Sequence, residues 1–297
     1  MTDPSKGRLP DFVVIGAPKA ATTSLHYYLS IHPEIFMSEP KETRYFDSSH
    51  GGNWHRGEEW YRSLFQSTRP RCGEATPAYA VGDEVGPVPQ RMAALIPDAK
   101  LIYIVREPYR RLESAYLMDY RRDFFRGTFE EYVRSYQRAV RGSQYGSRLR
   151  EFLEYYPLER ILVLETVELG IHTAEVMRRV YSYLGVDADF RSVFFHHRQN
   201  TRALEVVPSE RGRRFLKSRF MTSMRAWLPK RVYYHFRNLM LLPFRAPQPS
   251  LQLPASLRTE LKEDFRREVV LLRQLTGLAL PSLDQEERVS CEQAATA

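Results

Sequence analysis

Short apolar runs alternate along this chain with segments whose apolar residues recur at helical spacing. The runs lie at residues 12–15, 100–105 and 161–165. Their nearly continuous apolar character predicts strands of a parallel sheet that is covered on both faces. Helical spacing is found at about 25–29, 58–65, 89–95, 108–122, from 128, at 145–156, 173–184 and 254–275. Strands alternating with helices predict an α/β fold, a single domain with a central parallel sheet flanked by helices on both faces.

Capping residues set the limits of several of these elements. Pro108 suits the first turn of a helix, and Thr128 with Glu131 forms the pattern of a capping box. Gly185 is expected to end the helix that begins near Thr173. The predicted domain covers residues 11–283, with flexible ends at 1–10 and 284–297.

Composition changes this picture little. The chain has 297 residues, of which 43% are hydrophobic and 27% charged, as in ordinary globular proteins. The first residues are polar, and no apolar run approaches the roughly 18 residues of a membrane span. Cys72 and Cys291 lack metal-ligand or CxxC spacing, and nothing favours a bond between them. These features predict a cytoplasmic location.

Net charge is concentrated in one segment. Ten of the 44 Lys and Arg residues lie between Arg211 and Arg245, together with none of the 36 Asp and Glu residues. The rest of the chain holds 34 basic and 36 acidic residues, so the overall charge of +8 belongs to this segment. It could form a lid over an anionic cofactor or acceptor, or contact a membrane surface through its aromatic residues. Nucleic-acid binding is a less favoured alternative. The segment could also be a solvated helical face without a binding function.

The first strand leads into a loop with the composition of an anion site. After Phe12-Val13-Val14-Ile15 come Gly16, Pro18 and Lys19, then Ala20, Ala21 and three hydroxyl residues, Thr22, Thr23 and Ser24. The N–H groups and the dipole of a helix N-terminus favour negative charge. Lys19 adds a mobile positive charge, and the hydroxyls add donors. The order differs from a Walker A loop, because no glycine stands directly before the lysine.

A second basic motif follows the strand at 100–105. The sequence Arg106-Glu107-Pro108 opens a helix that carries Ser114 in its second turn. Ligands of open α/β sheets bind at the carboxyl ends of strands, so Arg106 is placed to meet an anion, with Ser114 as a donor. A surface ion pair of Arg106 with Glu107 is the alternative interpretation.

Taken together, the two motifs resemble those of sulfotransferases that use 3′-phosphoadenosine 5′-phosphosulfate (PAPS). The first is similar to the family's P-loop-like 5′-phosphosulfate loop, Pro-Lys-x-Gly-Thr-Thr, with Ala21 in place of glycine. The second is similar to its 3′-phosphate motif, Arg-x-Pro followed by Ser-x-Tyr. The resemblance implies a PAPS-dependent sulfotransferase whose cofactor contacts are residues 19–24, Arg106, Ser114 and, more weakly, Arg202. It implies no metal.

The resemblance extends to the branch that includes heparan sulfate sulfotransferases and related bacterial enzymes. Lys41-Glu42-Thr43-Arg44-Tyr45-Phe46-Asp47 and Gly73-Glu74-Ala75-Thr76-Pro77-Ala78-Tyr79 follow that branch's order. It implies that Glu42 is the catalytic base and that Lys41, Arg44, Glu74 and Tyr79 contact the acceptor. A saccharide or glycolipid is the first candidate acceptor, and a hydroxylated small metabolite the second.

One departure bears on the acceptor. Heparan sulfate enzymes usually place a lysine after the glutamate of their Glu-x-x-Pro segment, whereas Ala75 follows Glu74 here. The site therefore has one cation fewer for a polysulfated acceptor.

Sulfuryl transfer calls for a proton acceptor and for a cation beside the leaving group. The acceptor must lose a proton as it attacks sulfur, which is the task of Glu42. Charge develops on the leaving phosphate, and the Lys19 ammonium is the candidate that neutralises it. His26, His32 and His55 are formal alternatives to Glu42. The adjacent His196 and His197 are not spaced for joint metal binding.

Two other functions remain open from sequence. A P-loop kinase using ATP is disfavoured because no Gly-Lys-Ser/Thr occurs. A non-enzymatic membrane or nucleic-acid module would be built on residues 211–245. Oligomeric state is not predicted by any feature.

Overall fold

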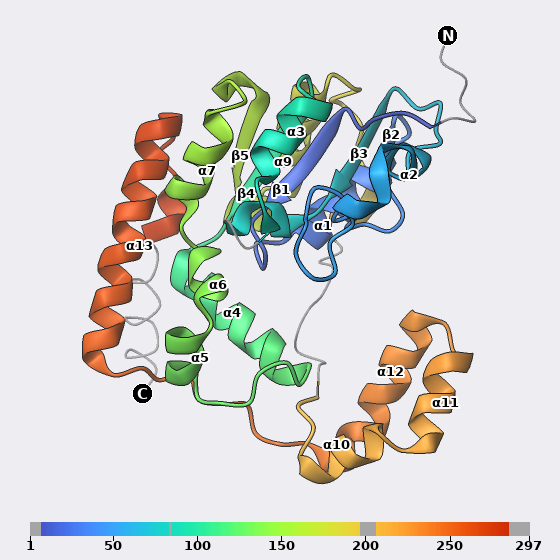
Figure 1. Ribbon diagram of the computed structural model, residues 1–297, viewed down its shortest axis with the longest axis vertical. Helices are drawn as coiled ribbons and strands as arrows, with labels where there is room; N and C mark the ends of the chain where they lie inside the picture. Colours follow the sequence, from blue (N-terminus) through green and yellow to red (C-terminus); the bar gives the residue numbers. More distant parts are fainter. Residues whose placement is uncertain (1–6, 83–84, 197–205, 285–297) are drawn as a thin grey trace.

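The computed structural model describes residues 7–82, 85–196 and 206–284 (Figure 1). Arg202, His197, Cys291 and most of the predicted flexible ends lie outside these residues. A five-stranded sheet forms the centre, with the order β2-β3-β1-β4-β5 and every pairing parallel. Its strands are β1 (Phe12–Gly16), β2 (Ile35–Met37), β3 (Arg71–Ala75), β4 (Lys100–Val105) and β5 (Ile161–Glu165). The predicted parallel α/β sheet is confirmed.

Strand order places a switch point at β1. The chain first moves from β1 toward β2 and β3, and then returns across β1 to β4 and β5. Because crossovers between parallel strands are right-handed, connections that run in opposite directions cover opposite faces of the sheet. On one face α1 (Thr22–Ser30) lies beside α9 (Thr173–Leu184), where Tyr181 donates to the carbonyl of Tyr28 at 3.0 Å. The crevice of such sheets lies above the strands where the order reverses, here β1 and β4.

Six of the remaining helices lie close to predicted positions: α2 (Gly57–Ser63), α3 (Val88–Leu95), α4 (Pro108–Arg121), α5 (Phe129–Ser135), α7 (Tyr145–Leu153) and α13 (Ala255–Thr276). The structure adds α6 (Gln137–Arg141) and α8 (Thr166–Ile171). Thr128 and Glu131 form the capping box of α5, and Gly185 ends α9 in the left-handed conformation, both as predicted.

Short 3₁₀ turns join several of these elements. They are η2 (Trp54–Arg56), η3 (Pro77–Val81), η5 (Leu158–Arg160), η6 (Val193–His196) and η9 (Pro281–Asp284).

Two apolar clusters form the core. The larger surrounds the sheet, whose β1 residues Phe12, Val13, Val14 and Ile15 are fully buried. The smaller joins α4, α5 and α13. In it, Leu257, Leu261 and Phe265 of α13 are buried at the helical spacing seen in the sequence.

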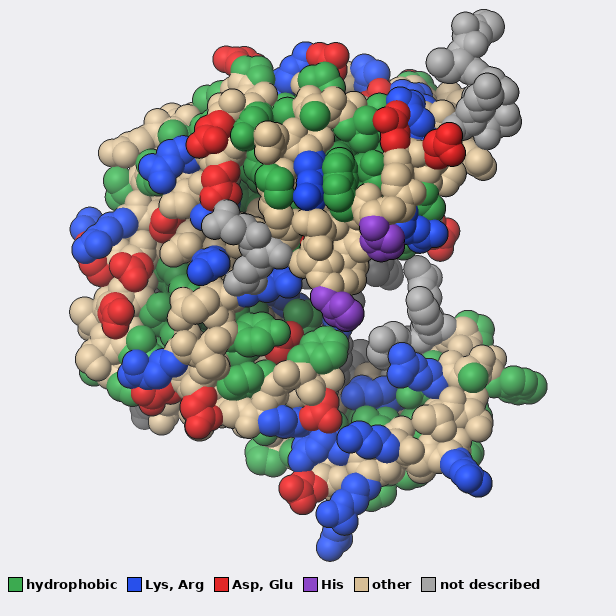
Figure 2. All heavy atoms as spheres, in the orientation of Figure 1, with side chains coloured by type: hydrophobic (Ala, Val, Ile, Leu, Met, Phe, Trp, Pro, Cys, Tyr) green, Lys and Arg blue, Asp and Glu red, His purple; other side chains and the backbone are tan. Residues whose placement is uncertain are grey.

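A small lobe extends from the body (Figure 1). It contains α10 (Glu210–Leu216), α11 (Arg219–Trp227), α12 (Lys230–Leu241) and η8 (Leu242–Phe244). Figure 2 shows a hollow between this lobe and the sheet-containing body. We call residues 208–245 the basic lobe.

Candidate active site

The loop between β1 and α1 has a backbone suited to an anion. Lys19 and Ala21 both have positive φ, 70° and 64°, and Ala21 is the N-cap of α1. Among the described residues no side chain caps this helix, and the positive end of a helix dipole favours an anion. Gly16 precedes the loop where a Cβ would lie only 2.8 Å from Cβ of Ala80. This close approach explains why the strand ends in glycine.

Arg106 enters the same region from the end of β4. Its guanidinium donates to the carbonyl of Lys19 at 3.4 Å, while Tyr145 donates to the Arg106 carbonyl at 2.7 Å. Burial lowers the pKa of Arg106. Glu107, the neighbour considered as its ion-pair partner, instead caps α4 by accepting from the N–H groups of Tyr109 and Arg110. The motif therefore directs Arg106 toward the first loop.

Ser114 lies in the second turn of α4 and is 2% exposed. Its Oγ atom has no hydrogen-bond partner in the described part of the chain. A buried hydroxyl without a partner costs free energy, so such an atom beside an anion site is a candidate for a ligand contact. The sequence predicts that Ser114 donates a hydrogen bond to a phosphate group. An unpaired hydroxyl at this position fits that role.

Lys19 faces α4 from the first loop. Its Nζ atom lies 3.1 Å from the sulfur of Met118. Asp119, next along the helix, accepts from Tyr132 at 2.6 Å, and burial raises the pKa of this carboxyl group. Met118 and Asp119 were not singled out in the sequence, because only the folded chain brings α4 against the loop.

Glu42 and Lys41 approach the first loop from the side of β2. Lys41 Nζ lies 3.5 Å from Oγ1 of Thr23 and 3.3 Å from Oε1 of Glu42. The Glu42 side chain is 48% exposed, so its carboxylate can meet an incoming molecule. Burial lowers the pKa of Lys41, and Glu42 acts in the opposite sense. The two predicted residues thus lie beside the anion loop.

Glu74 organises the segment that carries Glu42. Its fully buried carboxylate accepts hydrogen bonds from Thr43, Thr76 and Tyr61, each at 2.6 Å, and from Tyr79 at 3.2 Å. Burial raises the pKa of Glu74, while these hydroxyl donors oppose the shift. Thr43, which the sequence analysis did not identify as a site residue, directly follows Glu42 and ties its segment to this network.

Backbone bonds strengthen the same attachment. The Ala75 N–H donates to the Lys41 carbonyl at 3.2 Å, and the Arg44 N–H donates to Thr76 Oγ1 at 3.2 Å. Arg44 pairs with buried Asp47 at 2.5 Å. Glu74 and Tyr79, predicted as acceptor contacts, are 0% and 2% exposed, so the folded segment itself occupies their polar atoms. Their contact with an acceptor stays a prediction.

The rival histidines occupy different environments. His32 is fully buried, and its two ring nitrogens bond to the Asp187 carbonyl and the Glu34 N–H. His55 lies in η2. His26 lies on α1 close to Lys41, and burial together with Lys41 lowers its pKa to about 4. His26 is therefore linked electrostatically to the site through Lys41.

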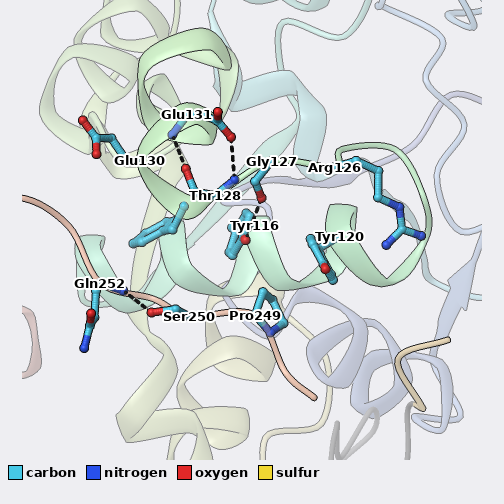
Figure 3. Close-up of a pocket in the computed structure, with 11 residues that line it drawn as sticks. Tyr116, Tyr120, Arg126, Gly127, Thr128, Glu130, Glu131, Pro249, Ser250 and Gln252 are labelled. Atoms are coloured by element: carbon cyan, nitrogen blue, oxygen red, sulfur yellow. Dashed lines mark hydrogen bonds between the residues drawn. The ribbon is translucent and has the colours of Figure 1, made fainter. Parts of the chain in front are cut away.

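A second hollow, separate from the anion loop, lies beside the C-terminal half of α4. Figure 3 shows it between Tyr116 and Tyr120 of α4, the loop at Gly127 and the connector at Pro249. The capping bonds of Thr128 and Glu131 occupy its polar side. None of the predicted site residues lines it. Among the described residues there is no group of His, Cys, Asp and Glu that could hold a metal ion, and no helix long and apolar enough to span a membrane.

Comparison with known proteins fits this arrangement. A family model described as "Sulfotransferase domain" matches residues 9–223. The chain belongs to the sulfotransferase family. Mouse bifunctional heparan sulfate N-deacetylase/N-sulfotransferase 2 is 30% identical over an alignment of 209 residues, with 60% of this chain and 22% of that protein covered. Mouse heparan sulfate glucosamine 3-O-sulfotransferase 3A1 is 29% identical over 210 residues, covering 67% of this chain and 51% of that one.

A solved sulfotransferase structure extends the likeness in fold. The sulfotransferase from Alicyclobacillus acidocaldarius has a TM-score of 0.64 and 23% identity, with 94% of this chain and all of that chain covered. The chain spans about a fifth of the first mouse relative and about half of the second. The activities of those whole proteins therefore do not transfer directly to this chain.

Proposed function

We propose that this protein transfers a sulfuryl group from PAPS to a hydroxyl or amine of a saccharide. One observation carries the proposal: Lys19, Arg106 and the Lys41–Glu42 pair, from three separate strand ends, meet around the N-terminus of α1. Arg106 and Lys41 are cations whose pKa values are lowered by burial, so an anion between them would relieve a cost that the protein bears alone.

The donor would be held by the two motifs. Residues 19–24 would surround the 5′-phosphosulfate, and Arg106 with Ser114 would hold the 3′-phosphate. Arg202, outside the described residues, is proposed as a further contact. PAPS supplies an activated sulfur–oxygen bond, which breaks as the acceptor oxygen or nitrogen bonds to sulfur.

The protein's own groups would assist both sides of this displacement. Glu42 would accept the proton of the attacking hydroxyl or amine, and its exposed carboxylate is accessible to an acceptor. Lys19 would neutralise charge on the phosphate as the bond breaks. Lys41 holds Glu42 next to Thr23, so that the base faces the end of the loop where transfer occurs.

The acceptor class is proposed from three considerations. The two mouse relatives are named for heparan sulfate, a carbohydrate. Lys41 and Arg44, proposed as acceptor contacts, lie on the segment of Glu42, where they pair with Glu42 and Asp47. Glu74 and Tyr79, the other two proposed contacts, hold that segment through hydrogen bonds to Thr43. Ala75 replaces the lysine that heparan sulfate enzymes place there, so a weakly sulfated saccharide or a glycolipid suits this site better than a densely sulfated polymer.

Transfer assays would test the proposal. The protein would be incubated with PAPS and a panel of an unsulfated glycosaminoglycan backbone, a neutral glycolipid and a phenol, and products would be detected by mass spectrometry. We expect a product with a saccharide or glycolipid, and a loss of at least about a hundredfold in kcat for Glu42→Gln, as is typical when a general base is removed.

Two variants serve as controls. Glu39→Gln changes an exposed carboxylate on the same segment and should leave kcat unchanged. His26→Asn should retain most of the activity, since a histidine with a pKa of about 4 is a weak base at neutral pH. Full activity of Glu42→Gln, or loss of activity only in His26→Asn, would overturn the assignment of the base.

A further inference from the structure

The basic lobe is a folded unit with its own small core. Its two ends are joined by an antiparallel bridge between Pro208 and Arg245, and the Ser209 N–H donates to the Phe244 carbonyl at 2.8 Å. Inside it, Phe215 stacks on Phe244 with ring centroids 5.4 Å apart, and Met221 and Leu241 are fully buried. These internal contacts hold the surface residues of the lobe in a fixed arrangement.

That surface is positively charged. Within 211–245 all ten charged residues are Lys or Arg. Six of them have exposed side chains: Arg211, Arg214, Lys217, Arg219, Arg225 and Arg245. No carboxylate in the described part of the chain pairs with these six. Figure 2 shows Lys and Arg side chains over the lobe, with apolar side chains among them.

Large apolar side chains are exposed on the same helices. Trp227, at the end of α11, is 86% exposed, and Phe220 at its start is 53% exposed. On α12 and η8, Val232, Leu239 and Leu242 are between 50% and 58% exposed. Single exposed apolar residues are common in proteins, but five within one small lobe that carries only positive charge between Arg211 and Arg245 are not expected of a solvated face.

We propose that the basic lobe docks on an anionic lipid surface. Lipid headgroups would meet the Arg and Lys side chains, and Trp227 with its apolar neighbours would enter the boundary between headgroups and acyl chains. A nucleotide or a sulfated polymer would satisfy the charges but leave Trp227, Leu239 and Leu242 in water. The exposed apolar residues therefore favour a lipid surface over a lid that covers an anionic ligand.

Vesicle sedimentation with the full chain would test this inference. We expect binding to vesicles of 70% phosphatidylcholine and 30% phosphatidylglycerol, weak binding to phosphatidylcholine alone, and a marked loss in 0.5 M NaCl. Arg219→Glu/Arg225→Glu should reduce the partition coefficient by at least about tenfold, because each basic residue near an anionic surface contributes a several-fold factor. The body variant Arg150→Glu/Arg178→Glu removes the same charge and should bind within about threefold of the wild type.

Trp227 supplies an independent readout. Its emission should shift to the blue on vesicle binding, and Trp227→Ala should both abolish that shift and weaken partitioning. Circular dichroism would confirm that the variants fold. Lys19→Ala should bind vesicles normally, so failure of the sulfotransferase proposal would leave this result untouched.

Three results would overturn the inference. They are an equal loss in the lobe and body variants, binding that is independent of both the anionic lipid and Trp227, and tighter binding to heparin or DNA that Trp227→Ala leaves unchanged. The last would identify the lobe as a polyanion site instead.

Discussion

At the scale of single residues, a comparison of Ser114 with Ser143 distinguishes a ligand-binding serine from a structural one. Its buried Oγ atom has no partner among the described residues, whereas Ser143 Oγ accepts from Arg111 at 2.5 Å and donates to the Pro108 carbonyl at 2.9 Å. Both hydroxyls are buried near the start of α4, so the two serines form a matched pair.

Ser114→Ala should leave the free energy of unfolding unchanged or raise it, because it removes an unsatisfied buried hydroxyl. The same variant should weaken binding of adenosine 3′,5′-bisphosphate about threefold to tenfold, the value of one hydrogen bond. Ser143→Ala should instead lower the free energy of unfolding by about 1–3 kcal/mol. Urea unfolding and calorimetric titration would measure both quantities. A destabilised Ser114→Ala with unchanged affinity would make Ser114 a structural residue.

Ala21 shows what a motif can and cannot reveal. The sequence identified it as the position where the family has glycine, and the structure gives the reason, a φ of 64°. Sequence alone does not specify a backbone angle, because the surrounding loop imposes it.

Replacing Ala21 with glycine should raise the free energy of unfolding by about 1 kcal/mol, since an L-residue is strained at this φ. Ala20→Gly is the control, as Ala20 is buried and does not have positive φ. Ala20→Gly should lower the free energy of unfolding. Denaturant titration would measure this quantity for both variants, and an equal change in the two would contradict the backbone strain assigned to Ala21.

At the scale of elements, local patterns predicted most of the secondary structure. Continuous apolar runs located β1, β4 and β5, and the regular spacing from Leu257 to Leu272 located α13. The break between α5 and α6 at Tyr136 was not predicted, nor was the short helix α8. Such brief elements depend on packing against neighbours rather than on a repeating pattern.

The network at Glu74 was also beyond prediction. It joins Glu74 to Thr43 and Tyr61, which are separated from it by 31 and 13 residues. The motif pattern identified Glu74, but only the fold shows that four hydroxyls bind its carboxylate in the interior.

A dependence of stability on pH should follow from this burial. The pKa of Glu74 is raised in the folded protein, so the folded state holds its proton more tightly than the unfolded state. The contribution of Glu74 to stability is therefore full below the ordinary pKa of about 4.5 and is lost as pH rises through the raised value. The free energy of unfolding of the wild type minus that of Glu74→Gln should fall as pH increases from about 4. Urea unfolding between pH 4 and 8 would show it, and a difference that grows with pH would contradict the direction.

At the scale of the whole molecule, sheet topology brings the site together. The order reverses at β1, so the loop after β1 and the helix after β4 face each other, and the segment after β2 joins them through Lys41 and Thr23. The sequence predicted two separate anion motifs and, through the family resemblance, Glu42. The strand order that makes them neighbours is a long-range property that no local pattern records.

Titration calorimetry with adenosine 3′,5′-bisphosphate tests the central claim most directly. The control, Arg110→Ala, removes a more exposed arginine that pairs with Glu113 at 3.2 Å. We predict that the wild type binds the bisphosphate more tightly than ATP with Mg²⁺, that Lys19→Ala and Arg106→Ala each weaken binding by at least about tenfold, and that Arg110→Ala binds like the wild type. Unchanged binding in both Lys19→Ala and Arg106→Ala, or tighter binding of ATP, would contradict the two-phosphate site.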